Sequence, residues 1–124
     1  MMLGDNEVIA FSQTTQPELA KAFYSDVLGL KLEEDNPLAL IFLAGRMMLR
    51  VQKVNAFSPL PSCSLGWKVT DIRVIVQLSK KGVTFQRYEG MNQDEFGIWL
   101  SPSGAKVCWF KDPDGNTLSL TRFP

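Results

Sequence analysis

Apolar and polar positions in the first half of the chain predict one helix and four strands. Between Leu19 and Val27, apolar residues recur at spacings of three and four, which is typical of the buried face of a helix. Thr15 and Glu18 fit a capping box at its start, and Gly29 follows its end, where a left-handed residue is favourable. The predicted strands are Glu7–Ser12, Leu30–Glu34, Pro37–Ala44 and Met47–Val54.

The same order of elements returns after a linker over residues 55–62, where two nearby prolines disfavour regular structure. Asp71 is a predicted cap for a helix over Ile72–Lys81, and Gly82 follows that helix as another glycine follows the first one. Asp112–Asn116 is a strong turn signal, because proline fixes φ and glycine accepts positive φ. The predicted strands are Ser64–Val69, Val83–Tyr88, Val107–Lys111 and Thr117–Phe123, with an additional strand-like piece, Phe96–Leu100, in a region that the first half lacks.

These elements form two βαβββ units in tandem, the first over about residues 5–54 and the second over about residues 63–124. The predicted fold class is therefore α+β, in a single domain of residues 1–124. A four-stranded sheet with one helix leaves its other face bare. We expect the two units to share a curved, incompletely closed mixed β-sheet around a cleft, and we expect the functional site in that cleft.

The composition is that of an ordinary globular protein, with 45% hydrophobic and 21% charged residues. Thirteen basic residues balance thirteen acidic ones, so no charge excess indicates a nucleic acid or an anionic membrane as partner. No run approaches the ~20 apolar residues that cross a bilayer, and no basic segment precedes an apolar one as in a signal peptide. We expect a cytoplasmic protein.

The residue types present limit the chemistry. The chain has no histidine, which excludes catalytic systems and metal sites that depend on imidazole. Its two cysteines, Cys63 and Cys108, lie far apart in the sequence and lack the spacing of a zinc or redox pair. We interpret both as buried small hydrophobic residues. A carboxylate site for a hard cation stays possible on composition alone.

Three segments, which occur along the chain in the family's order, resemble the vicinal oxygen chelate superfamily. This superfamily includes glyoxalase I, bleomycin-resistance proteins and extradiol dioxygenases. Ala22–Leu30 is similar to the family's first helix and the glycine after it, and Trp109–Asn116 is similar to its closing strand and turn. Val69–Ile72, followed by Leu78 and Gly82, is similar to its middle segment. The resemblance implies the paired βαβββ fold and a homodimer, in which the units pair within one chain or across two chains.

The metal enzymes of this family take ligands from the first and last strand of each unit. By resemblance, these four positions fall on Val8 or Ile9, on Arg50, on Ser64 and on Ser119. Apolar side chains do not bind metal ions, serine hydroxyls are not the usual ligands there, and a guanidinium repels a cation. We therefore expect no metal and no cofactor, and metal-dependent glyoxalase or dioxygenase activity is disfavoured.

Alternation along the predicted strands divides their side chains between two faces. By resemblance, Arg50, Ser64 and Ser119 face the cleft, whereas Trp67 packs under the helix. Trp109 faces the cleft if the register places it beside Ser119, and Trp99 lies in the insert that could cover the mouth. Each of these two tryptophans is equally well explained by core or dimer packing. Two methionines, Met47 and Met48, are better explained by core or interface packing than by pocket lining.

Arg50 is the strongest candidate for ligand contact, because a guanidinium in a partly apolar hollow is costly unless it is paired. Its partner is either a carboxylate of Glu89, Asp94 or Glu95, or an anionic group of a ligand. The acidic residues of the Asp112–Asn116 segment are interpreted as turn formers instead.

Three classes of function remain. The favoured one is metal-independent binding or sequestration of a small aromatic or anionic molecule, as the resemblance to bleomycin-resistance proteins implies. The second is an enzyme, either metal-free or a glyoxalase-like or dioxygenase-like one with ligands at other positions, and the third is a dimerisation module with no small ligand. No catalytic residue is assigned. The predicted ligand-binding residues are Arg50, Ser64, Trp99, Trp109 and Ser119.

Overall fold

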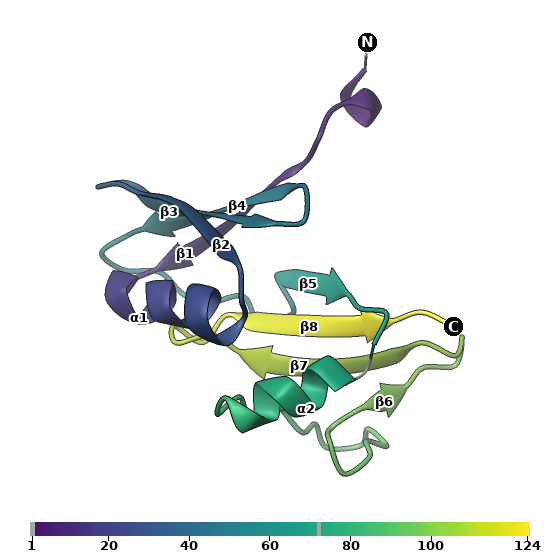
Figure 1. The fold of residues 1–124 in the computed structure, drawn as a ribbon. Coiled ribbons are helices and arrows are strands. Elements are labelled where there is room, and N and C mark those ends of the chain that lie inside the picture. Colours follow the sequence, from purple (N-terminus) through teal and green to yellow (C-terminus); the bar gives the residue numbers. More distant parts are fainter. Residues whose placement is uncertain (1, 72) are drawn as a thin grey trace. The chain divides into compact units, whose positions relative to one another are not determined.

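The computed structural model describes residues 2–71 and 73–124, and it confirms the expected α+β class (Figure 1). The chain divides into two compact units between Ser58 and Pro59. Each unit has its own four-stranded mixed sheet, and neither sheet closes into a barrel. The first unit contains η1 (Leu3–Asp5), β1 (Ile9–Thr14), α1 (Pro17–Ala22), η2 (Phe23–Val27), β2 (Lys31–Asp35), β3 (Ala39–Ala44) and β4 (Met47–Lys53). The second contains β5 (Leu65–Lys68), α2 (Arg73–Lys80), β6 (Trp99–Leu100), β7 (Lys106–Lys111) and β8 (Thr117–Arg122).

The first sheet has the strand order β1-β4-β3-β2, with β1 parallel to β4 and the other pairs antiparallel. Leu49 and Val51 of β4 are buried, whereas Arg50 between them is only half-buried, as alternation along a strand requires. The helical segment adds Tyr24 to this core, with its ring centroid 5.5 Å from that of Phe42. Both rings are 0% exposed, so they form the centre of the first unit's core.

The second sheet repeats this topology in the order β5-β8-β7-β6. Again the strands that come first and last in the sequence of the unit, β5 and β8, are parallel, and β7 and β8 are antiparallel. One face of the sheet is apolar and buried, and helix α2 contributes two buried side chains to the same unit. These buried residues are Ile75, Leu78, Cys108, Phe110, Leu118 and Leu120. The face with the other side chains of β7 and β8 is less buried.

The first helix starts differently from the prediction. Gln16 is its N-cap residue and Pro17 its first residue, so the expected capping box of Thr15 and Glu18 is wrong. The physical reason is that proline is favoured at the first helical position. In addition, the Gln16 N–H donates a hydrogen bond to Thr14 Oγ1 at 3.0 Å. From Phe23 the helix continues as the π-helical turn η2.

No helix in the described residues is long and apolar enough to span a membrane.

The second unit contains a larger departure from the prediction. Residues 83–88 do not form the expected strand, although the Gln86 N–H donates to the Trp109 carbonyl oxygen at 2.7 Å. The place beside β7 belongs to β6, whose Trp99 is in register with Val107. The strand-like piece predicted in the insert therefore supplies the second strand of this unit in chain order, which lies at the edge of its sheet. The predicted helix start at Ile72 lies outside the described residues, and α2 is described from Arg73 onward.

The turn between β7 and β8 is built on one buried carboxylate. Asp112 is 6% exposed, and its Oδ1 accepts the backbone N–H groups of Asp114 and Asn116 at 3.0 and 2.9 Å. Its Oδ2 accepts the side-chain amide of Asn116 at 2.8 Å. Gly115 has a φ of +89°, which an L side chain rarely adopts. The interpretation of this segment as a turn is confirmed.

Replacing Asp112 with alanine is expected to lower the free energy of unfolding by about 2–3 kcal/mol, because buried donors would lose their acceptor. Urea denaturation followed by tryptophan fluorescence measures the change. The control is Glu89→Ala, which removes an exposed acidic residue of the same unit. Equal midpoints for the two variants would contradict the structural role of Asp112.

Candidate functional site

The exposed face of the second sheet brings together two of the predicted site residues. Ser119 of β8 is in register with Gly66 of β5 on one side and with Trp109 of β7 on the other. Paired residues of neighbouring strands project to the same face. This row of three residues therefore lies opposite the buried face, and Trp109 has the register that its predicted orientation required.

Three aromatic rings gather at the Trp109 end of this row. The ring centroid of Trp109 lies 5.5 Å from that of Tyr88, with an interplanar angle of 84°. It lies 6.2 Å from that of Trp99, with an angle of 35°. The edge-to-face pair has the geometry that aromatic quadrupoles favour. We refer to Tyr88, Trp99 and Trp109 as the aromatic cluster; sequence reasoning missed Tyr88, because it placed this residue in a regular strand.

Ser119 stands between the aromatic cluster and an exposed thiol. The Cys63 thiol lies within hydrogen-bond distance of Ser119 Oγ, at 3.1 Å, and of the Leu65 carbonyl oxygen, at 3.2 Å, and its single hydrogen can be donated to either oxygen. Cys63 is exposed, so its interpretation as a buried residue is wrong, whereas Cys108 is buried as expected. The reason is that Cys63 precedes β5, outside the part of the chain that the sheet covers. When the Cys63 hydrogen is donated to Ser119 Oγ, the Ser119 hydroxyl keeps its own hydrogen for donation.

The small size of Gly66 creates space for the Ser119 side chain. A Cβ atom added at Gly66 would lie 2.5 Å from Ser119 Oγ, closer than real Cβ contacts. Ser64, the neighbouring predicted site residue, bonds through its N–H and its hydroxyl to the Thr117 carbonyl oxygen, at 3.0 and 3.4 Å. The Ser64 hydroxyl thus forms a hydrogen bond with the backbone, whereas the Ser119 hydroxyl lies over the Cα side of Gly66, where no side chain is present.

Arg50 lies at the centre of the first sheet. It is in register with Phe11 of β1 and with Ile41 of β3. Arg50 is half-buried, and the described residues of its own unit give it no hydrogen bond or ion pair. A guanidinium between two apolar neighbours is a favourable site for an anionic group.

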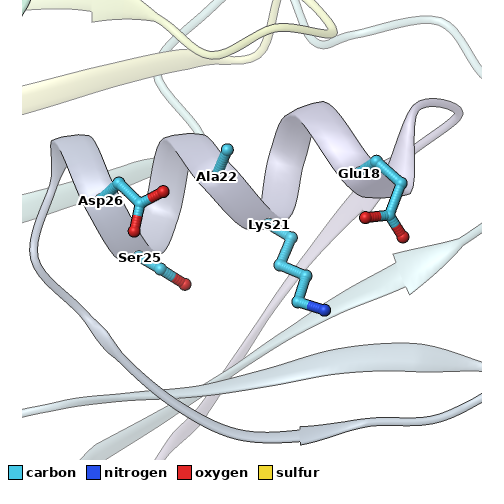
Figure 2. A pocket seen from close by; sticks show the side chains of 5 residues that line it. All are labelled: Glu18, Lys21, Ala22, Ser25 and Asp26. Atoms are coloured by element: carbon cyan, nitrogen blue, oxygen red, sulfur yellow. The ribbon is translucent and has the colours of Figure 1, made fainter.

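A separate concavity of about 290 Å³ lies along the first helix (Figure 2). Its lining residues are Glu18, Lys21, Ala22, Ser25 and Asp26. The Lys21 ammonium lies 3.1 Å from Asp35 Oδ2. Hydrogen bonds from Lys53 and from Lys21 lower the pKa of the Asp35 carboxyl, and the Asp35 bond raises the pKa of Lys21. The cation of this concavity is thus already paired, and none of the predicted site residues lines it.

The side chains offer little to a metal ion. Within residues 2–71 and 73–124, no group of three or more acidic or cysteine side chains could hold one. The positions that the resemblance gives to metal ligands carry Val8 or Ile9, Arg50, Ser64 and Ser119. None of these side chains supplies a carboxylate, an imidazole or a thiolate.

The structure is similar to many solved structures. A bleomycin-binding protein complexed with bleomycin is 21% identical, with a TM-score of 0.74, over 96% of this chain and 99% of that one. A member of the glyoxalase/bleomycin resistance protein/dioxygenase superfamily from Sphaerobacter thermophilus is 21% identical, with a TM-score of 0.74, over 94% and 96%. A lactoylglutathione lyase from Agrobacterium tumefaciens is 18% identical, with a TM-score of 0.71, over 94% and 92%. No family model and no curated protein sequence matches the chain.

Proposed function

We propose that this chain, which has the fold of the vicinal oxygen chelate (glyoxalase/bleomycin resistance/dioxygenase) superfamily, binds and sequesters a small aromatic or anionic molecule without a metal ion. The resemblance expected from the sequence is confirmed for the fold. A shared fold does not carry a function, so the proposal rests on the side chains of this chain.

The observation that carries the proposal is the aromatic cluster beside Ser119. A flat organic ring placed against Trp109 or Trp99 would bury a large apolar area, and ring–ring contacts add about 0.5–1.5 kcal/mol beyond that burial. The Ser119 hydroxyl, in register with Trp109, can form a hydrogen bond with a polar group of the same ligand. An apolar surface with a few well-placed polar groups is typical of small-molecule sites.

Two cations support the anionic part of the proposal. Lys68 is in register with Thr121, so it lies on the same face of the second sheet as Ser119. Its ammonium is 6.0 Å from the centroid of the Phe123 ring, and the residue is exposed. In the first unit, Arg50 is the cation that we propose for anion contact. Either one can pair with a carboxylate or a phosphate.

The donor chemistry supports metal independence. A metal-dependent lyase or dioxygenase uses its ion to polarise substrate oxygens, and the positions that the family uses for ligands carry apolar, cationic or hydroxyl side chains here. Binding by this chain is therefore expected to withstand chelation.

Ligand titration tests the proposal. The probes are bleomycin, 4-nitrobenzoate and nitrobenzene, and binding is measured by calorimetry and by quenching of tryptophan fluorescence, with and without EDTA. We expect saturable binding of at least one probe, unchanged by EDTA. Trp109→Leu should weaken it by about tenfold or more, which corresponds to ~1.4 kcal/mol.

The matched control is Phe96→Leu, which removes an exposed ring outside the aromatic cluster. This variant should bind like the unaltered protein. Absence of binding for all three probes, loss of binding in EDTA, or equal behaviour of the two variants would each contradict the proposal.

A further inference from the structure

One side-chain amide holds together the irregular segment that leads into β6. Gln93 Oε1 accepts the Tyr88 N–H at 2.8 Å. Its Nε2 donates to the carbonyl oxygens of Gln86 and Gly97, at 2.9 and 2.8 Å. All three bonds are to backbone groups, so the amide takes the place of the strand ladder that this segment lacks.

Backbone contacts connect Gln93 to all three residues of the aromatic cluster. It binds the backbone of Tyr88 directly, and its own backbone forms an isolated bridge with Trp99. It also binds the Gln86 carbonyl oxygen, while the Gln86 N–H donates to the Trp109 carbonyl oxygen at 2.7 Å. The position of the Tyr88 ring against Trp109 thus depends on a short chain of hydrogen bonds that passes through one residue.

The far side of the segment has its own supports. Asp94 Oδ1 accepts the N–H groups of Phe96 and Ile98, both at 2.9 Å. Gly97 has a φ of +87°, and a Cβ added there would lie 3.2 Å from the Cβ of Phe85. The two Asp94 bonds support residues 94–98 in addition to the bond from Gln93 to the Gly97 carbonyl oxygen. Loss of the amide is therefore expected to release the Tyr88 side of the segment and not the whole of it.

We propose that Gln93 is a positioning residue for the aromatic cluster, which it shapes by holding the Tyr88 ring against Trp109. Its effect on ligand affinity rests on the proposed function, whereas its effect on ring geometry does not. The amide donates twice and accepts once, a combination that glutamate cannot reproduce when ionised. A carboxylate at this position would face two carbonyl oxygens, which disfavours its charged form.

The test compares Gln93→Glu with Asn92→Asp, which makes the same change of amide to carboxylate at the exposed neighbouring residue. Near-ultraviolet circular dichroism of the ligand-free protein reports the coupling of the three rings, and far-ultraviolet circular dichroism checks that the fold is kept. At neutral pH, we expect Gln93→Glu to lose most of the near-ultraviolet signal of the cluster and to bind the probe 4-nitrobenzoate at least threefold more weakly. Asn92→Asp should match the unaltered protein in both.

Acidification separates hydrogen bonding by residue 93 from a merely structural role, because only the former predicts that the near-ultraviolet signal of Gln93→Glu depends on pH. A protonated glutamate regains one donor and keeps one acceptor. The near-ultraviolet signal of Gln93→Glu should therefore recover as the pH falls through the pKa of the new carboxyl. Gln93→Met has a similar length but no hydrogen-bonding group, so it should lose the signal at every pH; it also serves if Gln93→Glu does not fold.

The two proposals fail in different ways. If the unaltered protein does not bind the probe while the near-ultraviolet signal changes as described, the proposed function is wrong and the positioning role of Gln93 stands. If both Gln93 variants keep the near-ultraviolet signal of Asn92→Asp, or if Gln93→Glu loses it without acid recovery, the positioning role is wrong.

Discussion

Replacing Phe42 with alanine is expected to lower the free energy of unfolding by about 3–5 kcal/mol, because deleting a buried ring removes its transfer energy and leaves a cavity. Phe42 is 0% exposed, and its ring packs 5.5 Å from that of Tyr24, measured between centroids. The loss is a large fraction of the stability of a small protein. Urea denaturation followed by far-ultraviolet circular dichroism measures it.

The same sheet offers a matched control for this prediction. Phe11 belongs to the edge strand β1 and is 57% exposed. Phe11→Ala removes the same atoms from a site that water already reaches, so it should change the free energy of unfolding by less than about 1 kcal/mol. Similar losses in the two variants would show that the core of the first unit does not lie between the helix and β3.

The two cysteines are expected to differ strongly in their reactivity toward thiol reagents. Burial raises the pKa of the Cys108 thiol from 9.0 to about 12, and the residue is 1% exposed. Cys63 is exposed. Because the thiolate is the nucleophile, a disulfide reagent at pH 8 should modify one thiol quickly in the native protein and two in denaturant. Cys63→Ser should abolish the fast phase, and Cys108→Ala should leave it unchanged.

The raised pKa of Cys108 also makes the free energy of unfolding depend on pH. The unfolded chain releases this proton near pH 9, whereas the folded protein holds it until about pH 12. The stabilisation is fully present below pH 9 and is lost as the pH rises toward 12. The stability difference between the unaltered protein and Cys108→Ala should therefore shrink over this range, and a constant difference would contradict the burial of the thiol.

Much of the fold could be predicted because local signals agree with the tertiary structure. Gly29 and Gly82 have φ values of +78° and +93°, which is why glycine follows both helices. Residues 83–88 misled the prediction because alternation reports which side chains are apolar and not which backbone groups have partners. The position beside β7 is taken by Trp99 and Leu100, the end of the strand-like piece Phe96–Leu100 that the sequence indicated only as an addition to the four predicted strands.

The candidate site could be predicted only in part. The face of Trp109 depended on its register with Ser119, and a shift of one residue would have reversed it. Tyr88 belongs to the aromatic cluster and Gln93 supports it, but both lie in an irregular segment whose side-chain hydrogen bonds follow no periodic sequence pattern. The binding roles of Arg50, Ser64, Trp99, Trp109 and Ser119 stay predictions until ligands are tested.

The parallel pairing of first and last strands has a consequence for the order in which the chain can fold during translation. In the first unit, β1 can pair with β4 as soon as residues 47–53 have left the ribosome, so this sheet can form before the second unit has emerged. In the second unit, β5 has no strand to pair with until the segment that begins at Thr117 has been synthesised. A nascent chain between these points would carry one complete sheet and one strand without its parallel partner.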